Sequence, residues 1–391
     1  FVRRAVSGSS ERSPAGTMAE FDYIVVGGGM AGASAAYELA GFARVLLIEM
    51  EERCGYHTTG RSAALYAETY GNRTVRGLTT GGKEFYLNPP AGFTDQLLLR
   101  PRGVMFIGRP DQQASLDALM AEVAGLRSNI RAITAQEAYR RSPVLKPGYL
   151  AGAVLDPDSM DIEVNALHQG YLRGLKARGG ELRTDAALLG LTRQDGQWLA
   201  ETRAGKFRSR VVIDAAGAWG DQVAALAGAR PVGITPKRRT AILFQPPPGI
   251  DSRDWHSVID ADEQFYFRPD AGRIMASPAD ETPMPPCDVQ PEELDIAILI
   301  DRLEQAADLP VRRIENRWAG LRSFAKDKTP VIGFDSRVEG FFWLVGQGGY
   351  GIQTAPGISR LVGALAQGRG MPTDLADLGV TEQALSPARF N

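Results

Sequence analysis

The stretch FDYIVVGGGMAGASAAYELAGFARVLLIE, residues 21–49, decides the fold. Its hydrophobic pattern predicts, in order, a strand, a glycine turn, a helix and a second strand at Tyr23–Val26, Gly27–Gly32, Ala31–Leu39 and Arg44–Ile48. A helix that joins two strands in this way forms a βαβ unit, in which the strands lie parallel to each other. The sequence therefore predicts an α/β fold built on a parallel sheet.

The glycines of the turn follow the spacing GxGxxG, at Gly27, Gly29 and Gly32. The first permits the tight turn, the second lets the backbone approach a pyrophosphate, and the third lets the helix pack closely on the strand. Glu49 lies 22 residues after Gly27, at the end of the second strand. A carboxylate there can accept hydrogen bonds from an adenosine ribose. The turn therefore predicts a dinucleotide site rather than the glycine turn of an unrelated α/β protein.

Three later segments favour FAD over NAD as this dinucleotide. They are GYHTTGRSAA at residues 55–64, the turn Ala215–Trp219 and the turn Gly346–Gly351. Glycine turns at the ends of several strands suit one extended cofactor, and the helix after the last turn would direct its positive end toward the flavin. We expect non-covalent FAD, because no cysteine lies near the last turn. The predicted FAD contacts are Gly27, Gly29, Met30, Ala31, Gly32, Glu49, Met50, Thr59, Gly60, Arg61, Ser62, Ala63, Ala216, Gly217, Trp219, Gly346, Gly348, Gly349, Tyr350, Gly351, Ile352 and Gln353.

The remaining pattern predicts two interleaved domains. We expect a Rossmann-type FAD-binding domain from residues 20–85, 151–235 and 325–391, and a substrate-binding domain from residues 86–150 and 236–324. Alternating strands and proline-rich loops after residue 236 predict an antiparallel-sheet α+β architecture for the second domain. Residues 1–19 are rich in arginine and serine, and we expect a disordered leader or added extension before a start at Met18.

Composition excludes several classes of function. Hydrophobic residues make up 44% of the 391 residues and charged residues 23%, which is typical of a globular protein with a sizeable core. A net charge of −2 gives no support for nucleic-acid binding. Two distant cysteines and three unclustered histidines predict no metal site and favour a reducing, cytoplasmic location. No apolar run of about 18 residues is present, so we expect no transmembrane helix.

Four motifs together resemble the D-amino-acid-oxidase-like superfamily of FAD enzymes, which includes glycine and sarcosine oxidases. They are GGGMAG (27–32) with Glu49, GRSAA (60–64), VVIDAAGAW (211–219), and TPVIG followed by GFFWLVGQGGYGIQT (329–333 and 340–354). Within the superfamily, four runs look most like the FAD-dependent D-arginine dehydrogenases: GYHTTGRSAALY, PKRR, WAGLRSF and QGGYGIQT, at residues 55–66, 236–239, 318–324 and 347–354. The likeness extends from residue 21 to about residue 370.

The resemblance implies oxidation of the Cα–N bond of a D-amino acid. A hydride passes from Cα to flavin N5, and the imino acid is then hydrolysed to a 2-oxo acid and ammonia. The resemblance assigns Arg322 to a bidentate clamp on the substrate carboxylate and Tyr266 to the same carboxylate. It further implies a second active-site arginine at Arg239, an aromatic lid or wall at Tyr70, and a backbone carbonyl near the substrate amine at Gly349.

The sequence departs from the arginine-preferring enzymes at the predicted side-chain pocket, which we assign to Leu65, Tyr66 and Val104. The resemblance places a histidine where Leu65 stands and a glutamate where Val104 stands. Burying a cationic side chain without that counter-charge costs several kcal/mol. We therefore expect uncharged D-amino acids, apolar or aromatic, to be preferred over D-Arg and D-Lys.

Several alternatives stay open at this point. Sarcosine-type secondary amines and 2-hydroxy acids are rival substrates that share the carboxylate. A non-enzymatic FAD-binding assembly protein and an NAD-binding module are rival functions. The electron acceptor, O2 or a quinone-type carrier, is undetermined by residue spacing.

Overall fold

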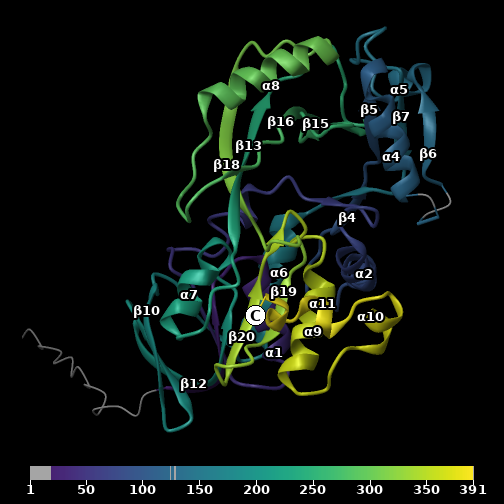
Figure 1. Cartoon of the computed structure of the whole chain (residues 1–391). Helices are drawn as coiled ribbons and strands as arrows, with labels where there is room; N and C mark the ends of the chain where they lie inside the picture. The colour runs from purple at the N-terminus through teal and green to yellow at the C-terminus, as the bar shows by residue number, and fades with distance from the viewer. Residues whose placement is uncertain (1–18, 124, 127–128, 391) are drawn as a thin grey trace, which may run out of the picture.

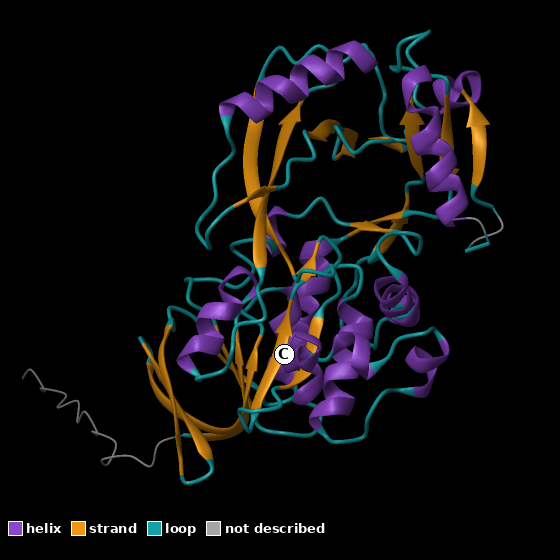
Figure 2. Ribbon diagram, viewed as in Figure 1, coloured by secondary structure: helices purple, strands orange, loops and turns teal. Residues whose placement is uncertain are grey.

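The computed structural model describes residues 19–123, 125–126 and 129–390. The chain forms two bodies, each built on a large sheet, which are the lower and upper bodies in Figures 1 and 2. The segment for which we expect a leader, residues 1–19, lies outside the described residues except for Ala19. No helix in the described part of the chain is both long and apolar enough to span a bilayer.

The lower body contains an eight-stranded sheet in the order β10-β11-β12-β1-β2-β9, with β20 beside β12 and β19 beside β20. Its strands are β1 (Glu20–Val26), β2 (Val45–Ile48), β9 (Glu181–Arg183), β10 (Leu188–Gln194), β11 (Gln197–Thr202), β12 (Gly205–Asp214), β19 (Val331–Phe334) and β20 (Phe341–Val345). Five of them, β9, β2, β1, β12 and β20, run parallel. The chain order reverses between β1 and β12, and in open α/β sheets ligands bind at such a point.

Helices cover this sheet, and the short helices α10 and α11 follow near the C-terminus (Figure 1). The helices of the lower body are α1 (Met30–Leu39), α2 (Arg73–Gly81), α3 (Lys83–Leu87), α6 (Val164–Ala177), α7 (Gly220–Leu226), α9 (Ala355–Ala366), α10 (Thr373–Asp377) and α11 (Glu382–Leu385). The alanine-rich α1 packs against both α6 and α9. Its small buried side chains let the three helices approach closely.

The upper body contains a ten-stranded sheet in the order β21-β18-β13-β16-β15-β14-β5-β7-β6, with β17 beside β13. Its strands are β5 (Val104–Gly108), β6 (Arg131–Thr134), β7 (Gly152–Asp156), β13 (Thr235–Phe244), β14 (Ser257–Asp260), β15 (Tyr266–Asp270), β16 (Arg273–Ser277), β17 (Thr282–Pro283), β18 (Ile314–Phe324) and β21 (Gln347–Gly348). Its helices are α4 (Gln113–Val123), α5 (Ala135–Arg141) and α8 (Glu293–Ala306). A small sheet of β3 (Leu65–Tyr66), β8 (Met160–Ile162) and β4 (Leu99–Pro101) completes the fold.

Helix α8 covers one face of the upper sheet (Figure 2), and α4 packs on the opposite face over β5 and β7. Leu299 and Leu303 of α8 belong to the same buried cluster as Phe244 and Phe267 of the sheet. Because successive side chains of a strand point to opposite faces, Tyr266 lies on the face away from α8. Strand alternation thus gives this sheet an apolar face under α8 and a functional face toward the lower body.

The predicted fold class is confirmed, and two local expectations are corrected. We assigned residues 151–235 to the FAD-binding domain, but β7 pairs with β5 and β6 in the upper sheet, so the chain returns to the lower body only after it. The sequence pattern of residues 206–213 also predicts two separate strands, at 206–208 and 210–213, whereas β12 is continuous. It pairs with β11 through its first half and with β20 through its last three residues, a change of partner that its local sequence does not reveal.

Replacing Gly32 by alanine tests the close packing of α1 on β1. A Cβ at this position would overlap the backbone carbonyl of Gly27, which cannot move away as a flexible side chain could. We expect the Gly32→Ala substitution to lower the free energy of unfolding by about 1–3 kcal/mol or more. The control is Gly190→Ala, where a Cβ meets no atom within 4 Å. Urea unfolding curves that are equal for the two variants would contradict this packing.

Candidate active site

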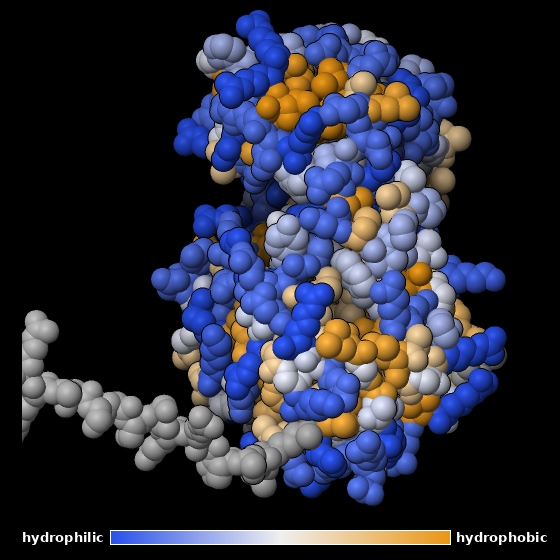
Figure 3. All heavy atoms as spheres, turned by 90° about the vertical axis from the view of Figure 1, so that its left-hand side faces the viewer, coloured by the Kyte–Doolittle hydropathy of each residue, from blue (hydrophilic) through white to orange (hydrophobic). Residues whose placement is uncertain are grey.

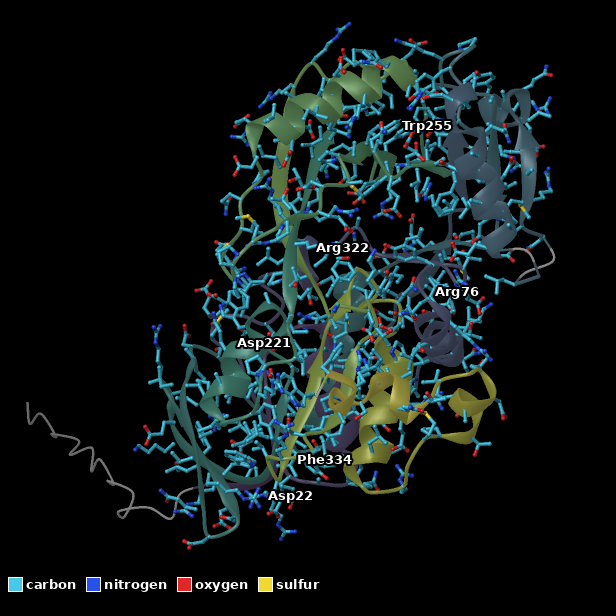
Figure 4. All side chains as sticks on the ribbon, viewed as in Figure 1. Asp22, Arg76, Asp221, Trp255, Arg322 and Phe334 are labelled. Atoms are coloured by element: carbon cyan, nitrogen blue, oxygen red, sulfur yellow. The ribbon has the colours of Figure 1, made fainter. Side chains whose placement is uncertain are left out.

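A large cavity of about 810 Å³ runs from the β1–α1 turn of the lower body to the functional face of the upper sheet. This volume lies within the range of about 300–1,000 Å³ that small-molecule sites occupy. Seen from the side, the surface narrows and is hollowed between the two bodies (Figure 3). Arg322 of β18 lies at this junction (Figure 4).

The glycine turn forms the lower end of the cavity. Gly27 has a φ of +107°, and a Cβ there would lie 2.5 Å from the carbonyl oxygen of Ala215. The N–H of Gly28 donates to Glu49 Oε2 at 2.7 Å, and the N–H of Glu51 donates to Glu49 Oε1 at 2.9 Å. Burial raises the pKa of the Glu49 carboxyl, although these backbone N–H groups counteract the rise. The turn and this acceptor lie together at the cavity, as a dinucleotide site requires.

The loop at residues 55–64 ties the lower body to the upper one. Thr59 Oγ1 accepts from the N–H of Met30, the first residue of α1, at 2.9 Å. On its other side, Arg61 donates to the carbonyl of Ala319 at 3.0 Å, and the indole of Trp318 donates to the carbonyl of Arg61 at 2.9 Å. Although Arg61 lines the cavity, its guanidinium holds β18.

The other two predicted turns also reach the cavity. Gly217 and Gly348 have positive φ values of +55°, and Gly346 has +77°, which explains why glycine stands at these positions. A Cβ at Gly348 would overlap the ring of Phe324. Helix α9 begins two residues after Gln353, so its N-terminal N–H groups follow directly on the lining residues. The backbone of several strand ends therefore borders one elongated space.

Most of the predicted cofactor contacts line this cavity. They are Gly27, Gly29, Met30, Ala31, Glu49, Met50, Thr59, Arg61, Ser62, Ala63, Ala216, Gly217, Trp219, Gly348, Gly349, Tyr350, Gly351, Ile352 and Gln353. Gly32, Gly60 and Gly346 do not line it. They lie one layer behind, where Gly32 packs against Gly27 and Gly60 donates to the carbonyl of Gly55 at 2.8 Å.

Arg322 is the central cation at the upper end of the cavity. Its side chain is 13% exposed, its Nη2 donates to the Tyr70 hydroxyl at 2.6 Å, and its Nη1 donates to Glu281 Oε1 at 3.3 Å. Burial disfavours its charge, but Tyr70, Tyr266 and Glu281 outweigh this effect and keep its pKa above the usual value. A Cβ at Gly349 would overlap the guanidinium. Only glycine therefore lets Arg322 occupy this position.

Arg239, Lys237 and Glu281 complete a charged cluster around Arg322. Antiparallel pairing places Lys237 directly opposite Arg322. Glu281 binds Lys237 at 3.0 Å and Arg239 at 3.2 Å, and the Arg239 guanidinium lies 6.0 Å from the Tyr266 ring centroid. Burial raises the pKa of Glu281, but the cations outweigh burial and lower it. Three cations share this carboxylate, so the cluster suits a further anion such as a substrate carboxylate.

Leu65 and Val104 line the upper part of the cavity, as expected of the side-chain pocket, but Tyr66 does not. Tyr66 is 1% exposed, packs edge-on against Tyr86, and donates to the carbonyl of Thr79 at 3.2 Å. The prediction that Tyr66 belongs to the side-chain pocket is therefore wrong, because this residue lies in the core of the lower body. Neighbouring residues of strand β3 point to opposite sides, so the cavity receives Leu65 alone.

Sequence reasoning missed two residues of the site. Glu281 follows β16 in a stretch without any motif. The buried His168 of α6 belongs to no motif, yet its Nε2–H donates to the carbonyl of Gly28 at 2.9 Å. Mainly because of burial, the pKa of His168 is lowered. A histidine on one face of a predicted helix gave no signal of this contact. In the described residues, no cluster of three or more His, Cys, Asp or Glu side chains could hold a metal ion.

Comparisons with known proteins agree with this geometry. A family model described as FAD dependent oxidoreductase matches residues 22–365. The hydrogen cyanide synthase subunit HcnC of Pseudomonas aeruginosa is 23% identical and covers 91% of this chain and 94% of its own. The crystal structure of glycine oxidase from Geobacillus kaustophilus superposes with a TM-score of 0.80 at 21% identity, over 93% of this chain and 99% of that one. L-proline dehydrogenase from P. horikoshii superposes with a TM-score of 0.78 at 20% identity, over 96% and 98%.

The neutral state of His168 makes the stability of the fold depend on pH. Its pKa is lowered in the folded protein, so the unfolded chain binds the proton first as pH falls through about 6.5. The free energy of unfolding should therefore decrease toward acid, by at most about 1.4 kcal/mol per pH unit from this group. The His168→Gln variant keeps a side-chain N–H donor but does not titrate. Urea unfolding between about pH 5 and 7 should show a weaker acid loss in this variant, and identical slopes would contradict the assignment.

Proposed function

We propose that this chain, which belongs to the family of FAD-dependent oxidoreductases, oxidises the Cα–N bond of D-amino acids whose side chains are uncharged. The balanced reaction takes two electrons and two protons from the amino acid to give an imino acid. Water then converts the imino acid to a 2-oxo acid and ammonia. Bound FAD supplies the hydride acceptor for this chemistry.

The buried Arg322 at the end of the glycine-lined cavity carries the proposal. A guanidinium fork binds a carboxylate through two parallel hydrogen bonds and so fixes the orientation of the substrate Cα. The Tyr70 hydroxyl accepts a hydrogen bond from Arg322, and Tyr266 and Arg239 lie in the same cavity wall. Glu281 acts as a positioning residue, because it contacts both Arg239 and Arg322.

The amino-acid class and its D configuration are inferred from the resemblance of residues 55–66 and 318–324 to the D-arginine dehydrogenases. Val104 and Leu65 both line the cavity. Because their side chains are apolar, neither can pair with a cationic side chain. This supports substrates other than D-Arg and D-Lys. We also propose a cytoplasmic location, because the two cysteines are free.

Anaerobic titration of the FAD-loaded protein tests the reaction. Uncharged D-amino acids should bleach the absorption band of oxidised flavin, whereas L-amino acids and 2-hydroxy acids should bleach it slowly or not at all. Stopped-flow rates across a panel of substrates give the order of preference. Fastest reduction by D-Arg would contradict the proposed side-chain class, and reduction by 2-hydroxy acids alone would contradict the amino-acid class.

The Arg322→Lys substitution tests the carboxylate clamp. Lysine keeps the charge but loses the fork, and a charge-assisted hydrogen bond is worth about 1.5–3 kcal/mol. We therefore expect KM to rise about tenfold to a hundredfold while FAD stays bound. Arg317→Lys, on the same strand at an exposed ion pair with Glu293, is the matched control. Equal KM values for the two variants would show that Arg322 does not bind the substrate.

A further inference from the structure

A row of side chains crosses the face of the upper sheet that lies away from α8. Phe106 of β5, Ile259 of β14 and Tyr266 of β15 are direct neighbours in the strand register. All three line the cavity and are partly exposed, whereas Met105 and Val258, beside them in the chain, are fully buried. Strand alternation therefore turns this row toward an open space.

Helix α4, which lies against β5 and β7 (Figure 1), limits this space at the end of the row away from Tyr266. Leu119 and Val123 of α4 line the cavity. Leu119 and Phe106 also pack against the same buried apolar cluster. The sheet and the helix thus border an apolar space that begins at Tyr266 and ends at α4.

Arg76, Glu122 and Arg268 bring charge to the border of this space, but each already has a partner. Arg76 of α2, which lies at the junction of the two bodies (Figure 4), forms an ion pair with Glu122 of α4 at 2.5 Å. Arg268 of β15 forms an ion pair with Asp161. An ionic side chain of a substrate would have to compete with these pairs, whereas an uncharged side chain needs no counter-charge.

The spacing of the strands matches the size of an aromatic ring. Neighbouring strands lie about 4.7–4.9 Å apart, so Tyr266 and Phe106 stand about 10 Å from each other, on either side of Ile259. Rings in aromatic pairs have centroids about 4.5–7 Å apart. A ring placed over Ile259 would therefore contact both aromatic side chains at once.

We propose that the substrate side chain is an aromatic ring, which lies over Ile259 between Tyr266 and Phe106, with Leu119 at its end. The inference rests on the proposed function, because it narrows the uncharged D-amino acids of that function to the aromatic ones. A methyl side chain would leave most of the row uncovered. A branched aliphatic side chain would cover Ile259 but form no ring pair with either neighbour.

Reduction of the FAD-loaded protein by D-phenylalanine, D-leucine and D-alanine tests the proposal. One methylene group in an apolar pocket changes kcat/KM about tenfold or more, so D-phenylalanine should exceed D-alanine at least about a hundredfold. Two ring pairs should place D-phenylalanine above D-leucine at least about threefold. D-leucine or D-alanine equal to or better than D-phenylalanine would overturn the proposal.

Two substitutions assign the preference to this space. Phe106→Leu removes one ring pair but keeps an apolar side chain, so the ratio of kcat/KM for D-phenylalanine to that for D-leucine should fall at least about twofold. Leu119→Phe fills the end of the space, so the ratio of D-phenylalanine to D-alanine should fall at least about tenfold. The matched control is Met120→Phe, because Met120 packs against the same buried cluster but does not line the cavity.

The ratios also define the results that would count against the assignment. Unchanged ratios in both Phe106→Leu and Leu119→Phe would overturn it. An equal loss in Met120→Phe and Leu119→Phe would overturn it as well, because a general disturbance of α4 would then explain the effect. Each ratio compares two substrates on the same variant, so a smaller yield of folded protein does not change it.

The two levels of inference fail in different ways. If no D-amino acid reduces the flavin, the proposed function is wrong and the aromatic preference falls with it. If D-amino acids reduce the flavin without any preference for an aromatic side chain, only the assignment of the row at Phe106, Ile259 and Tyr266 is wrong.

Discussion

The backbone contact between two glycine turns is the constraint on which this structure depends. Strands β1 and β12 are hydrogen-bonded neighbours up to the pair Val26–Asp214, so their following turns leave the sheet side by side. Gly27 can lie against the carbonyl of Ala215 only because it has no Cβ. The same turn starts α1, and its carbonyls contact Gly32 and His168. Any side chain here would separate the strand ends and open the cavity that they border.

A short loop carries this constraint to the upper body. Thr59 accepts from the first N–H of α1, while the neighbouring Thr58 donates to the carbonyl of Leu321 at 2.8 Å. Leu321 immediately precedes Arg322 on β18. The start of α1 and the strand that carries Arg322 are therefore joined through two adjacent threonines and a few hydrogen bonds. This arrangement explains how two bodies built from interleaved segments can hold the side chains of one site in fixed positions, to within a fraction of an ångström.

Charge is distributed unevenly along the cavity. At the lower end, Glu49 is an acceptor held by backbone N–H groups. At the upper end, Arg322, Arg239 and Lys237 share Glu281, and Arg268 shares Asp161 with Arg102. Buried cations with too few carboxylates are costly unless an anion or acceptor completes them. The upper end of the cavity thus has more hydrogen-bond donors than acceptors, and a substrate carboxylate would supply the missing acceptor.

The sequence by itself determined the βαβ unit and the FAD cofactor, and most of the cofactor contacts that it predicted line the cavity. Glycine spacing and the length of the βαβ unit are local properties, and they sufficed to predict Glu49, whereas Tyr266 and Arg322 were implied by the resemblance of local motifs to a known family. Only the tertiary structure decided the rest. In the tertiary structure Tyr66 points into the core, Glu281 contacts three cations, and His168 donates to the carbonyl of Gly28. Local sequence does not reveal these contacts, because they join segments tens to hundreds of residues apart.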